Sequence, residues 1–317
     1  MTQAKISVLI VTYKQADVIG RNIESILQQK EYGLHEIVIC DDNSPDNNWE
    51  VISEYCQKYP NIIRAYKNEK NLGIYGNSMK VASLHGDADL FCWLEGDDAL
   101  CDGFFKSTQE FISKNNVKLN EAVGIFADYY AINTMGQKVR MKNDFVLRNE
   151  PPFGAYMRSA ATWRASLFSR KVIESFSPIE LNKGLRLAEF LFDSQWFRFT
   201  DRTYYNPSVV GSIYYTGIGV SVTWGLTDNS SAYKTTESIS RWLYLIDHDI
   251  LTDKNDISWA KCQIEYCSCL DVFSFSKLMK FAFYFIKSNR NYQKLNMSSL
   301  FKRCARLILF KVRSRKK

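Results

Sequence analysis

Apolar and polar positions alternate in blocks along the first hundred residues. Residues 6–12, ISVLIVT, form an unbroken and largely β-branched run, which is typical of a strand buried on both faces of a sheet. The block that follows places four apolar residues on one stripe of a helix over 17–29: Ile19, Ile23, Ile26 and Leu27. The alternation then repeats, with strands expected at 36–40, 62–67 and 89–94 and helices at 48–59 and 75–85. Short strands alternating with short helices predict a parallel α/β sheet with right-handed crossovers.

Polar residues follow three of these strands directly. The segments are Thr12-Tyr13, the DDNS of 41–44 and the EGDD of 95–98. Ligands of open parallel sheets bind beyond the carboxyl ends of the strands, so we expect these segments to line one crevice. The three carboxylates of EGDD are costly to bury unless a cation neutralises them.

The second hundred residues are less regular. We expect a helix at 102–114, a strand at 122–132, a turn at 133–138, a helix at about 185–200 and a strand at 203–216. Residues 142–166 are rich in aromatic residues, Pro and Gly, and are long enough to predict a functional loop. A Gly/Ser stretch covers 217–225, and the pattern is helical beyond about residue 230.

Composition narrows the class of protein. The chain has 317 residues, of which 46% are hydrophobic and 24% charged, which indicates a globular and not a disordered protein. The apolar stretch before Tyr13 is too short for a signal-peptide core or a membrane span, so we expect a cytosolic location. Eight scattered cysteines indicate free thiols, and Cys262, Cys267 and Cys269 lack a fourth zinc ligand at a suitable spacing. The three histidines are too far apart to predict a metal triad.

Positive charge is concentrated at the C-terminal end. Residues 277–317 hold thirteen Lys and Arg and no Asp or Glu, although the net charge of the whole chain is only +7. Around residues 300–308, Leu300, Cys304, Leu307 and Ile308 form one apolar stripe among basic residues. A basic amphipathic helix of this kind indicates association with a membrane surface. The alternative is a helical cap that packs on the main domain. We find no nucleic-acid recognition motif, and we expect no nucleic-acid partner.

Four segments together carry a family resemblance. They are SVLIVTYKQADVIGRNIESILQQ, HEIVICDDNSPDN, NEKNLGIYGNSMKVA and LFCWLEGDD, in this order and at these distances. The chain resembles the family 2 glycosyltransferases over roughly residues 5–115. The resemblance implies a GT-A fold, which is a Rossmann-like, mostly parallel sheet flanked by helices, here with a helical, basic C-terminal extension. It divides residues 1–230 into a nucleotide-sugar-binding half, 1–115, and an acceptor-binding half, 116–230, ahead of the C-terminal region 231–317.

The resemblance also implies a metal site in the EGDD segment. Asp98 is expected to bind Mn²⁺ or Mg²⁺ directly, and Asp97 to contact the ribose or a metal-bound water. A hard divalent cation suits carboxylates and diphosphate oxygens. The role of Glu95, which stands where many relatives have Asp, is left open. The alternative is an acidic turn that caps the helix expected near Asp102.

The remaining nucleotide contacts are assigned through the same motifs. Asp42 matches the position that binds the base, typically uracil, although a DDNSPD helix-entry turn would explain the same residues. Asp41 is expected only to support that turn. Contacts to the nucleotide are implied for Thr12, Tyr13, Asn71, Gly73 and Asn77. Relatives often carry Arg where this chain has Gly76, and Lys80 is the expected substitute for that phosphate contact.

A catalytic base is expected on the late helix. Asp193 matches the family's acid there, and an inverting transferase needs a carboxylate to deprotonate the acceptor hydroxyl. Glu189 lies four residues earlier on the same helical face, and an exposed acidic face is the alternative explanation of the pair. Thr216 and Gly217 stand where relatives tend to have Arg or His.

These assignments imply a transferase that uses a nucleotide-diphosphate sugar, expected to be a UDP-sugar. The implied acceptor is a hydroxyl of a glycan, most simply a lipid-linked oligosaccharide of a surface polysaccharide, which a membrane-docked enzyme would reach. Two alternatives stay open. One is a sugar nucleotidyltransferase, which normally needs a Gly-rich phosphate loop that TYKQAD lacks. The other is a non-catalytic relative that binds glycans or membranes.

Overall fold

The computed structural model describes most of the chain up to residue 289. The described ranges are 3–148, 151–157, 162–178, 189–216, 242–243, 245–247, 250–251, 254–271 and 275–289. The chain forms two compact units. Unit 1 comprises residues 1–180 and 188–223, and unit 2 comprises residues 181–187 and 224–317. The predicted stripe at 300–308 and the Gly/Ser stretch at 217–225 lie outside the described residues.

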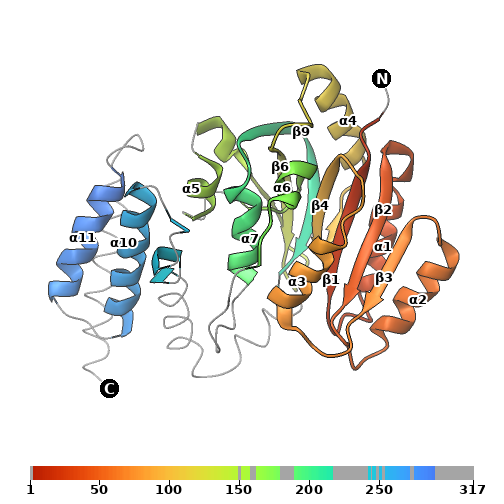
Figure 1. Ribbon diagram of the computed structural model, residues 1–317, viewed down its shortest axis with the longest axis horizontal. Helices are drawn as coiled ribbons and strands as arrows, with labels where there is room; N and C mark the ends of the chain where they lie inside the picture. Colours follow the sequence, from red (N-terminus) through yellow and green to blue (C-terminus); the bar gives the residue numbers. More distant parts are fainter. Residues whose placement is uncertain are drawn as a thin grey trace. The chain divides into compact units, whose positions relative to one another are not determined.

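The first half of unit 1 follows the predicted alternation. Its elements are β1 (Ile6–Thr12), α1 (Ile19–Leu27), η1 (Lys30–Tyr32), β2 (Leu34–Asp41), α2 (Asn48–Lys58), β3 (Ile63–Lys67), α3 (Gly73–Ser83) and β4 (Leu90–Glu95). The four strands lie side by side in the order β3-β2-β1-β4 and all pairs are parallel (Figure 1). Every residue of β1 is buried, as its unbroken apolar run predicts.

The second half of unit 1 makes the sheet mixed. It consists of β5 (Ala99–Leu100), α4 (Phe104–Asn115), β6 (Val123–Ile132), β7 (Lys138–Met141), η2 (Asp144–Arg148), α5 (Pro152–Met157), β8 (Ser166–Ser169), α6 (Arg170–Glu174), α7 (Glu189–Arg198) and β9 (Arg202–Tyr215). The sheet continues from β4 through β8, β6, β9 and β5, with β7 paired to β6. β8 is antiparallel to both β4 and β6 and joins the two halves.

The segment 142–166, predicted to be a loop, is only partly irregular. Its described residues contain η2 and α5, and β8 begins at Ser166. The turn at 133–138 is present and connects β6 to β7 as an antiparallel hairpin, a pairing that the sequence pattern did not predict.

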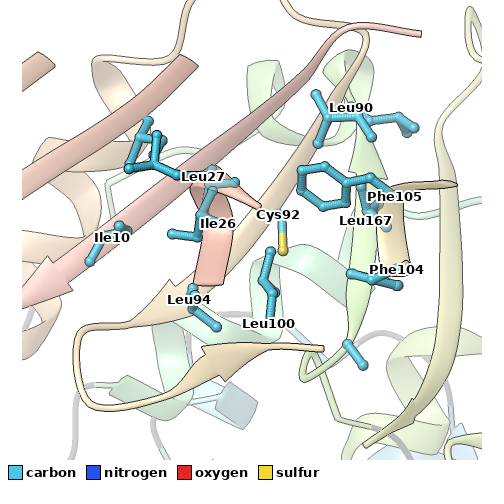
Figure 2. Packing of buried hydrophobic residues seen from close by; sticks show 14 of the residues in the cluster. Ile10, Ile26, Leu27, Leu90, Cys92, Leu94, Leu100, Phe104, Phe105 and Leu167 are labelled. Atoms are coloured by element: carbon cyan, nitrogen blue, oxygen red, sulfur yellow. The ribbon is translucent and has the colours of Figure 1, made fainter. Parts of the chain in front are cut away.

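One face of the sheet packs against α1, α2 and α4. Alternate residues of β1, β2 and β4 point to this side, and they form one buried apolar cluster with the three helices. Figure 2 shows part of it, with Ile26 and Leu27 from α1 and Phe104 and Phe105 from α4 beside the strand residues. This packing holds α1 against β4 and β5.

The opposite face is covered by α3 and α7 (Figure 1). The rings of Trp93 on β4 and Phe192 on α7 lie 4.5 Å apart, and Phe168 on β8 stacks on Trp196 at 4.8 Å. α7 also contacts α3, because the Gln195 side chain donates to the sulfur of Met79 at 3.4 Å. The aromatic layer therefore anchors α7 on the sheet in unit 1.

The described part of unit 2 contains two long helices, α10 (Lys254–Asp271) and α11 (Phe275–Asn289). They pack against each other through five buried residues: Trp259, Cys262, Leu278, Phe281 and Phe285. Among the described residues, no helix is both long and apolar enough to cross a membrane.

The cysteines agree with the prediction of free thiols as far as they are described. Five cysteines are thiols outside any disulfide: Cys40, Cys92 and Cys262 are buried, and Cys56 and Cys101 are partly exposed. Burial raises the pKa of the Cys40 and Cys92 thiols to about 12, which keeps them protonated. The side chains of Cys267, Cys269 and Cys304 lie outside the described residues.

Candidate active site

The polar ends of three strands meet at one edge of the sheet. Thr12 of β1 is in register with Asp41 of β2, and Val11 is in register with Glu95 of β4. The backbone continues the pairing past the strands, because the Asp42 amide donates to Thr12 O and the Gly96 amide donates to Val11 O, each at 3.0 Å. The prediction that the three polar segments lie together is confirmed.

The EGDD segment forms a tight acidic turn. The Asp98 amide donates to Glu95 O at 3.0 Å, and carboxylate oxygens of Glu95, Asp97 and Asp98 all lie within 4.8 Å of one another. Asp97 is 8% exposed and Asp98 only 1%. The turn does not cap α4 with these carboxylates, because the N-cap of α4 is Gly103 and no side chain caps it.

Arg164 and the amide of Tyr215 contact the carboxylates of this turn. The Arg164 side chain lies 3.4 Å from Glu95 Oε2 and 3.8 Å from Asp98 Oδ2. The Tyr215 amide donates to Asp98 Oδ1 at 3.2 Å. Burial still raises the pKa of Asp98 to about 7, against the charge of Arg164 and with the help of the Asp97 charge. Burial and the Asp97 charge thus disfavour the charged form of Asp98.

The donor set of the turn fits a hard divalent cation. Mn²⁺ and Mg²⁺ prefer oxygen ligands and are commonly held by one or two carboxylates, with the remaining positions filled by water and phosphate. The turn offers three carboxylates whose oxygens lie close enough to contact one ion. Burial of like charges at this spacing is costly without a cation. Asp97, Asp98 and Glu95 are thus suited to hold such an ion.

A second cluster lies at the end of β2. Asp42 is 3% exposed, and its Oδ1 accepts hydrogen bonds from Asn68 Nδ2 at 2.8 Å and from the Leu72 amide at 2.7 Å. Asn71 Nδ2 donates to the main-chain oxygen of Asp42 at 3.2 Å, and the Gly73 amide donates to Asn71 Oδ1 at 3.0 Å. Asn71 and Gly73 thus hold the loop that closes over Asp42.

Asn77 and Lys80 are turned inward in the same cluster. Asn77 Nδ2 donates to Cys40 O at 2.9 Å, and its Oδ1 accepts from Asn68 at 2.9 Å. Lys80 Nζ donates to Asn68 Oδ1 at 2.7 Å. Both residues therefore support the loop around Asp42. A Cβ at Gly76 would lie 2.8 Å from Leu72 Cβ, so a larger residue there would need the loop to shift.

Asp41 and Thr12 belong to a buried hydrogen-bond network. Asp41 accepts from Ser44 Oγ at 2.5 Å, from the Ser44 amide at 3.1 Å and from Asn48 Nδ2 at 2.7 Å. Asn48 also contacts Thr12 Oγ1 at 3.2 Å. Asp41 therefore supports the turn after β2, as predicted. Tyr13, 36% exposed, stands at the surface beyond β1.

Two residues at this edge have a left-handed backbone. Lys14 follows β1 with φ of 56°, and Asn43 follows β2 with φ of 57°. Such angles cost little for Asn but are uncommon for Lys. The Lys14 amide donates to Ser44 Oγ at 2.9 Å, so the two turns are tied to each other. Strained backbone of this kind is often found at ligand-binding edges.

The predicted base lies on α7. Asp193 is 6% exposed and shares its helix with Phe192 and Trp196, which pack on Trp93 of β4. Trp93 and Glu95 are two positions apart on β4, so their side chains point to the same face of the sheet. This is the face that α7 covers. The burial of Asp193 contradicts the alternative of an exposed acidic face. The Glu189 side chain lies outside the described residues.

The sequence pattern missed several residues that shape the site. Asn22 of α1 donates to the main-chain oxygens of Glu95 and Asp98, and Arg21 donates to Asp97 O at 2.7 Å. Arg164 reaches the turn from the segment before β8. Thr216, at a position where relatives tend to have Arg or His, binds Ile132 O through its amide and hydroxyl. Only Asn22 had a signal in the sequence, because it is a polar residue beside the apolar stripe of α1.

Comparison with known proteins now gives the family. Residues 7–171, about half of the chain, match the family described as Glycosyl transferase family 2. The chain belongs to this family. The match includes β1 to α6, and so all of the acidic turn and the Asp42 cluster. Asp193 lies beyond it, and its assignment rests on the motif alone.

Individual relatives of family 2 are distant. The processive diacylglycerol beta-glycosyltransferase of Mycoplasma pneumoniae is 26% identical over 148 residues, which cover 46% of this chain and 40% of that protein. The chain therefore matches well under half of the length of this curated relative.

Solved structures support the fold across nearly the whole chain. TarS of S. aureus, residues 1–349 in complex with UDP-GlcNAc, superposes with a TM-score of 0.57 at 13% identity, covering 91% of this chain and 81% of that one. The mannosyltransferase PcManGT of Pyrobaculum calidifontis, in complex with GDP-Man and Mn²⁺, gives 0.51 at 10% identity, covering 98% and 83%. The predicted GT-A fold of a family 2 member is confirmed.

Proposed function

We propose that this chain is a metal-dependent, inverting glycosyltransferase. It moves a sugar from a UDP-sugar to a hydroxyl of a lipid-linked glycan, as a step in the synthesis of a surface polysaccharide. The observation that carries the proposal is the acidic turn, where Glu95, Asp97 and Asp98 offer carboxylate oxygens within 4.8 Å of one another at the end of β4. Membership of family 2 and the UDP-GlcNAc complex of TarS support it.

The proposed roles follow from the geometry of the site. Asp98 and Asp97 hold Mn²⁺ or Mg²⁺, which when bound screens the diphosphate charge that grows as the sugar–phosphate bond breaks. Asp42 accepts a hydrogen bond from the base, with its carboxylate held by Asn68 and Leu72. Thr12 and Tyr13 make further contacts to the nucleotide. A carboxylate can accept a hydrogen bond from an N–H group of more than one base. The test therefore compares donors with different bases.

Asp193 is proposed to accept the proton of the acceptor hydroxyl as that oxygen attacks the anomeric carbon. The residue is 6% exposed and lies on a helix that aromatic packing anchors on the sheet. A general base contributes about 10²- to 10⁴-fold in rate. Asp193→Asn should therefore lower kcat by at least about 100-fold and leave nucleotide binding intact.

The test is product formation by the purified protein with Mn²⁺, a panel of UDP-, GDP- and dTDP-sugars and a lipid-linked glycan acceptor. Asp98→Asn should abolish metal-dependent nucleotide binding, and Asp193→Asn should abolish turnover only. Asp87→Asn, at the other end of β4, and Asp201→Asn, just after α7, remove exposed carboxylates and serve as controls. A folded protein that binds no nucleotide with Mn²⁺ would overturn the proposal.

The proposed acceptor agrees with the basic C-terminal region. Four exposed residues form one side of α11: Met279, Lys280, Phe283 and Lys287. Apolar and basic side chains on one side suit an anionic membrane surface. Sedimentation with anionic vesicles should fall for Lys280→Glu/Lys287→Glu and stay unchanged for Lys114→Glu on α4. Equal sedimentation of all three proteins would leave no support for membrane docking through α11.

A further inference from the structure

Arg164 stands between the acidic turn and an aromatic pair. Its side chain is 18% exposed, and it lies 3.4 Å from Glu95 Oε2 and 3.8 Å from Asp98 Oδ2. The guanidinium carbon lies 3.9 Å from the centre of the Tyr214 ring on β9 and 4.5 Å from that of Trp163. The guanidinium thus lies over the Tyr214 ring, with Nη2 toward Glu95 and Nε toward Asp98.

At this position Arg164 contacts carboxylates that a cation would also use. The carboxylates of Glu95 and Asp98 that face the guanidinium are two of the three that the turn offers to a metal ion. Two positive groups that share the same carboxylates at 3–4 Å repel each other, and little water is present at a 1% exposed Asp98 to screen them. A divalent cation that binds these carboxylates therefore competes electrostatically with the guanidinium for them.

A donor diphosphate would offer the displaced guanidinium a new partner. A diphosphate bound to a cation at the acidic turn brings further anionic oxygens to the place where Arg164 is held. The guanidinium fork matches phosphate oxygens in a bidentate way, and its stacking on Tyr214 limits how far it moves. A lysine at this position would keep the positive charge but could not bind a phosphate group in a bidentate way.

We propose that Arg164 couples cation binding to donor binding. It offsets part of the charge of the acidic turn in the absence of metal, weakens metal binding there, and transfers its contacts to the donor diphosphate once both ligands are present. The inference rests on the proposed function, since it needs a cation at the turn and a diphosphate beside it. It adds a specific consequence: Mn²⁺ and the nucleotide each bind weakly alone and strengthen each other.

The test compares binding and not turnover. Mn²⁺ binding without nucleotide, followed by the electron paramagnetic resonance signal of free Mn²⁺, should be several-fold tighter in Arg164→Gln than in the wild type. UDP binding at saturating Mn²⁺, measured by calorimetry, should be at least about tenfold weaker, because a charge-assisted bond is lost. The reciprocal strengthening of Mn²⁺ by UDP should shrink in the same variant.

Two further variants keep the outcome readable. Arg164→Lys keeps the positive charge, so its Mn²⁺ affinity without nucleotide should stay within about twofold of the wild type while UDP binding falls. Arg202→Gln removes a 62% exposed arginine elsewhere on unit 1 and should change neither. If the wild type binds Mn²⁺ and UDP and Arg164→Gln and Arg164→Lys bind both equally well, the coupling is refuted and the proposed function stands. If the wild type binds neither, both fail together.

Discussion

The side-chain amide of Asn22 holds the main chain of Asp98. Asn22 Nδ2 lies 3.0 Å from the main-chain oxygen of Asp98 and 2.8 Å from that of Glu95. Asn22 is fully buried on α1, on a helix face whose other buried residues are apolar except for Ser25. A single amide group from the first crossover helix therefore fixes the backbone of the acidic turn more than seventy residues later.

Replacement of Asn22 should loosen that turn. Asn22→Ala leaves two buried carbonyl groups without this donor, and we expect a loss of about 1–3 kcal/mol in the free energy of unfolding, measured by urea denaturation. Mn²⁺ affinity should fall as well, because the carboxylates lose their fixed spacing. Gln28→Ala, exposed at the end of the same helix, is the control and should be neutral. Wild-type stability in Asn22→Ala would show that the turn does not depend on this contact.

Asp42 allows a sharper test of nucleotide recognition. Its Oδ1 is the acceptor for Asn68 and for the Leu72 amide, and an asparagine keeps an oxygen at that position. Asp42→Asn replaces the other oxygen with an NH₂ donor, which cannot accept from the N–H of a base. We expect UDP affinity to fall about tenfold or more while the melting temperature stays near the wild-type value. Asp46→Asn, farther along the same loop, is the matched control. Unchanged UDP binding in Asp42→Asn would remove Asp42 from the base site.

Much of unit 1 could be predicted because its signals are local. An unbroken apolar run such as 6–12 is buried on both faces only in the interior of a sheet, and α1 follows from a 3.6-residue stripe. The register of Thr12 with Asp41 and of Val11 with Glu95 then follows from parallel pairing. The pattern therefore located the acidic turn, Asp42 and Thr12 at one edge.

The parts that were missed depend on distant partners. β5 and β8 have two and four residues, too few for a period to be visible, and they are strands only because β9, β4 and β6 supply their hydrogen bonds. Arg164 meets Glu95 across 69 positions of sequence, and nothing near residue 164 indicates a site. Asn77 is predicted to contact the nucleotide, and its amide group also binds Cys40 O and Asn68, a pairing that only the folded chain determines.

Gly96 is expected to tolerate no side chain. A Cβ there would lie 2.4 Å from Gln15 Oε1 and 2.9 Å from both Cβ and Oγ1 of Thr12. Gly96→Ala should therefore push the acidic turn away from β1, lower stability by about 1–3 kcal/mol and weaken Mn²⁺ binding. Gly20→Ala on α1 meets only Tyr55 at 3.5 Å or more and should be neutral or slightly stabilising, because Ala favours the helix. Urea denaturation of the two variants gives the comparison, and equal stability would contradict the close approach.

The raised pKa of Asp98 predicts how stability depends on pH. Burial raises this pKa to about 7 from the ordinary value of 3.8, while Arg164 and Arg21 oppose the rise and Asp97 adds to it. The folded state therefore binds a proton more tightly than the unfolded state, so this group stabilises the metal-free protein at low pH. That contribution is lost as pH rises from about 4 to about 7. Asp98→Asn carries no titrating group and should lose less stability between about pH 5 and about pH 8.

Thermal unfolding in the presence of a chelator measures this difference. The melting temperature of the wild type should fall relative to that of Asp98→Asn as pH rises through this range, and Asp201→Asn, which removes an exposed carboxylate, should follow the wild type. Added Mn²⁺ binds the deprotonated carboxylate, so it should raise the wild-type melting temperature more at about pH 8 than at about pH 5. Parallel pH curves for wild type and Asp98→Asn would mean that the buried carboxylate is already neutralised by Arg164 and its neighbours. In that case the acidic turn would not need a cation for charge balance.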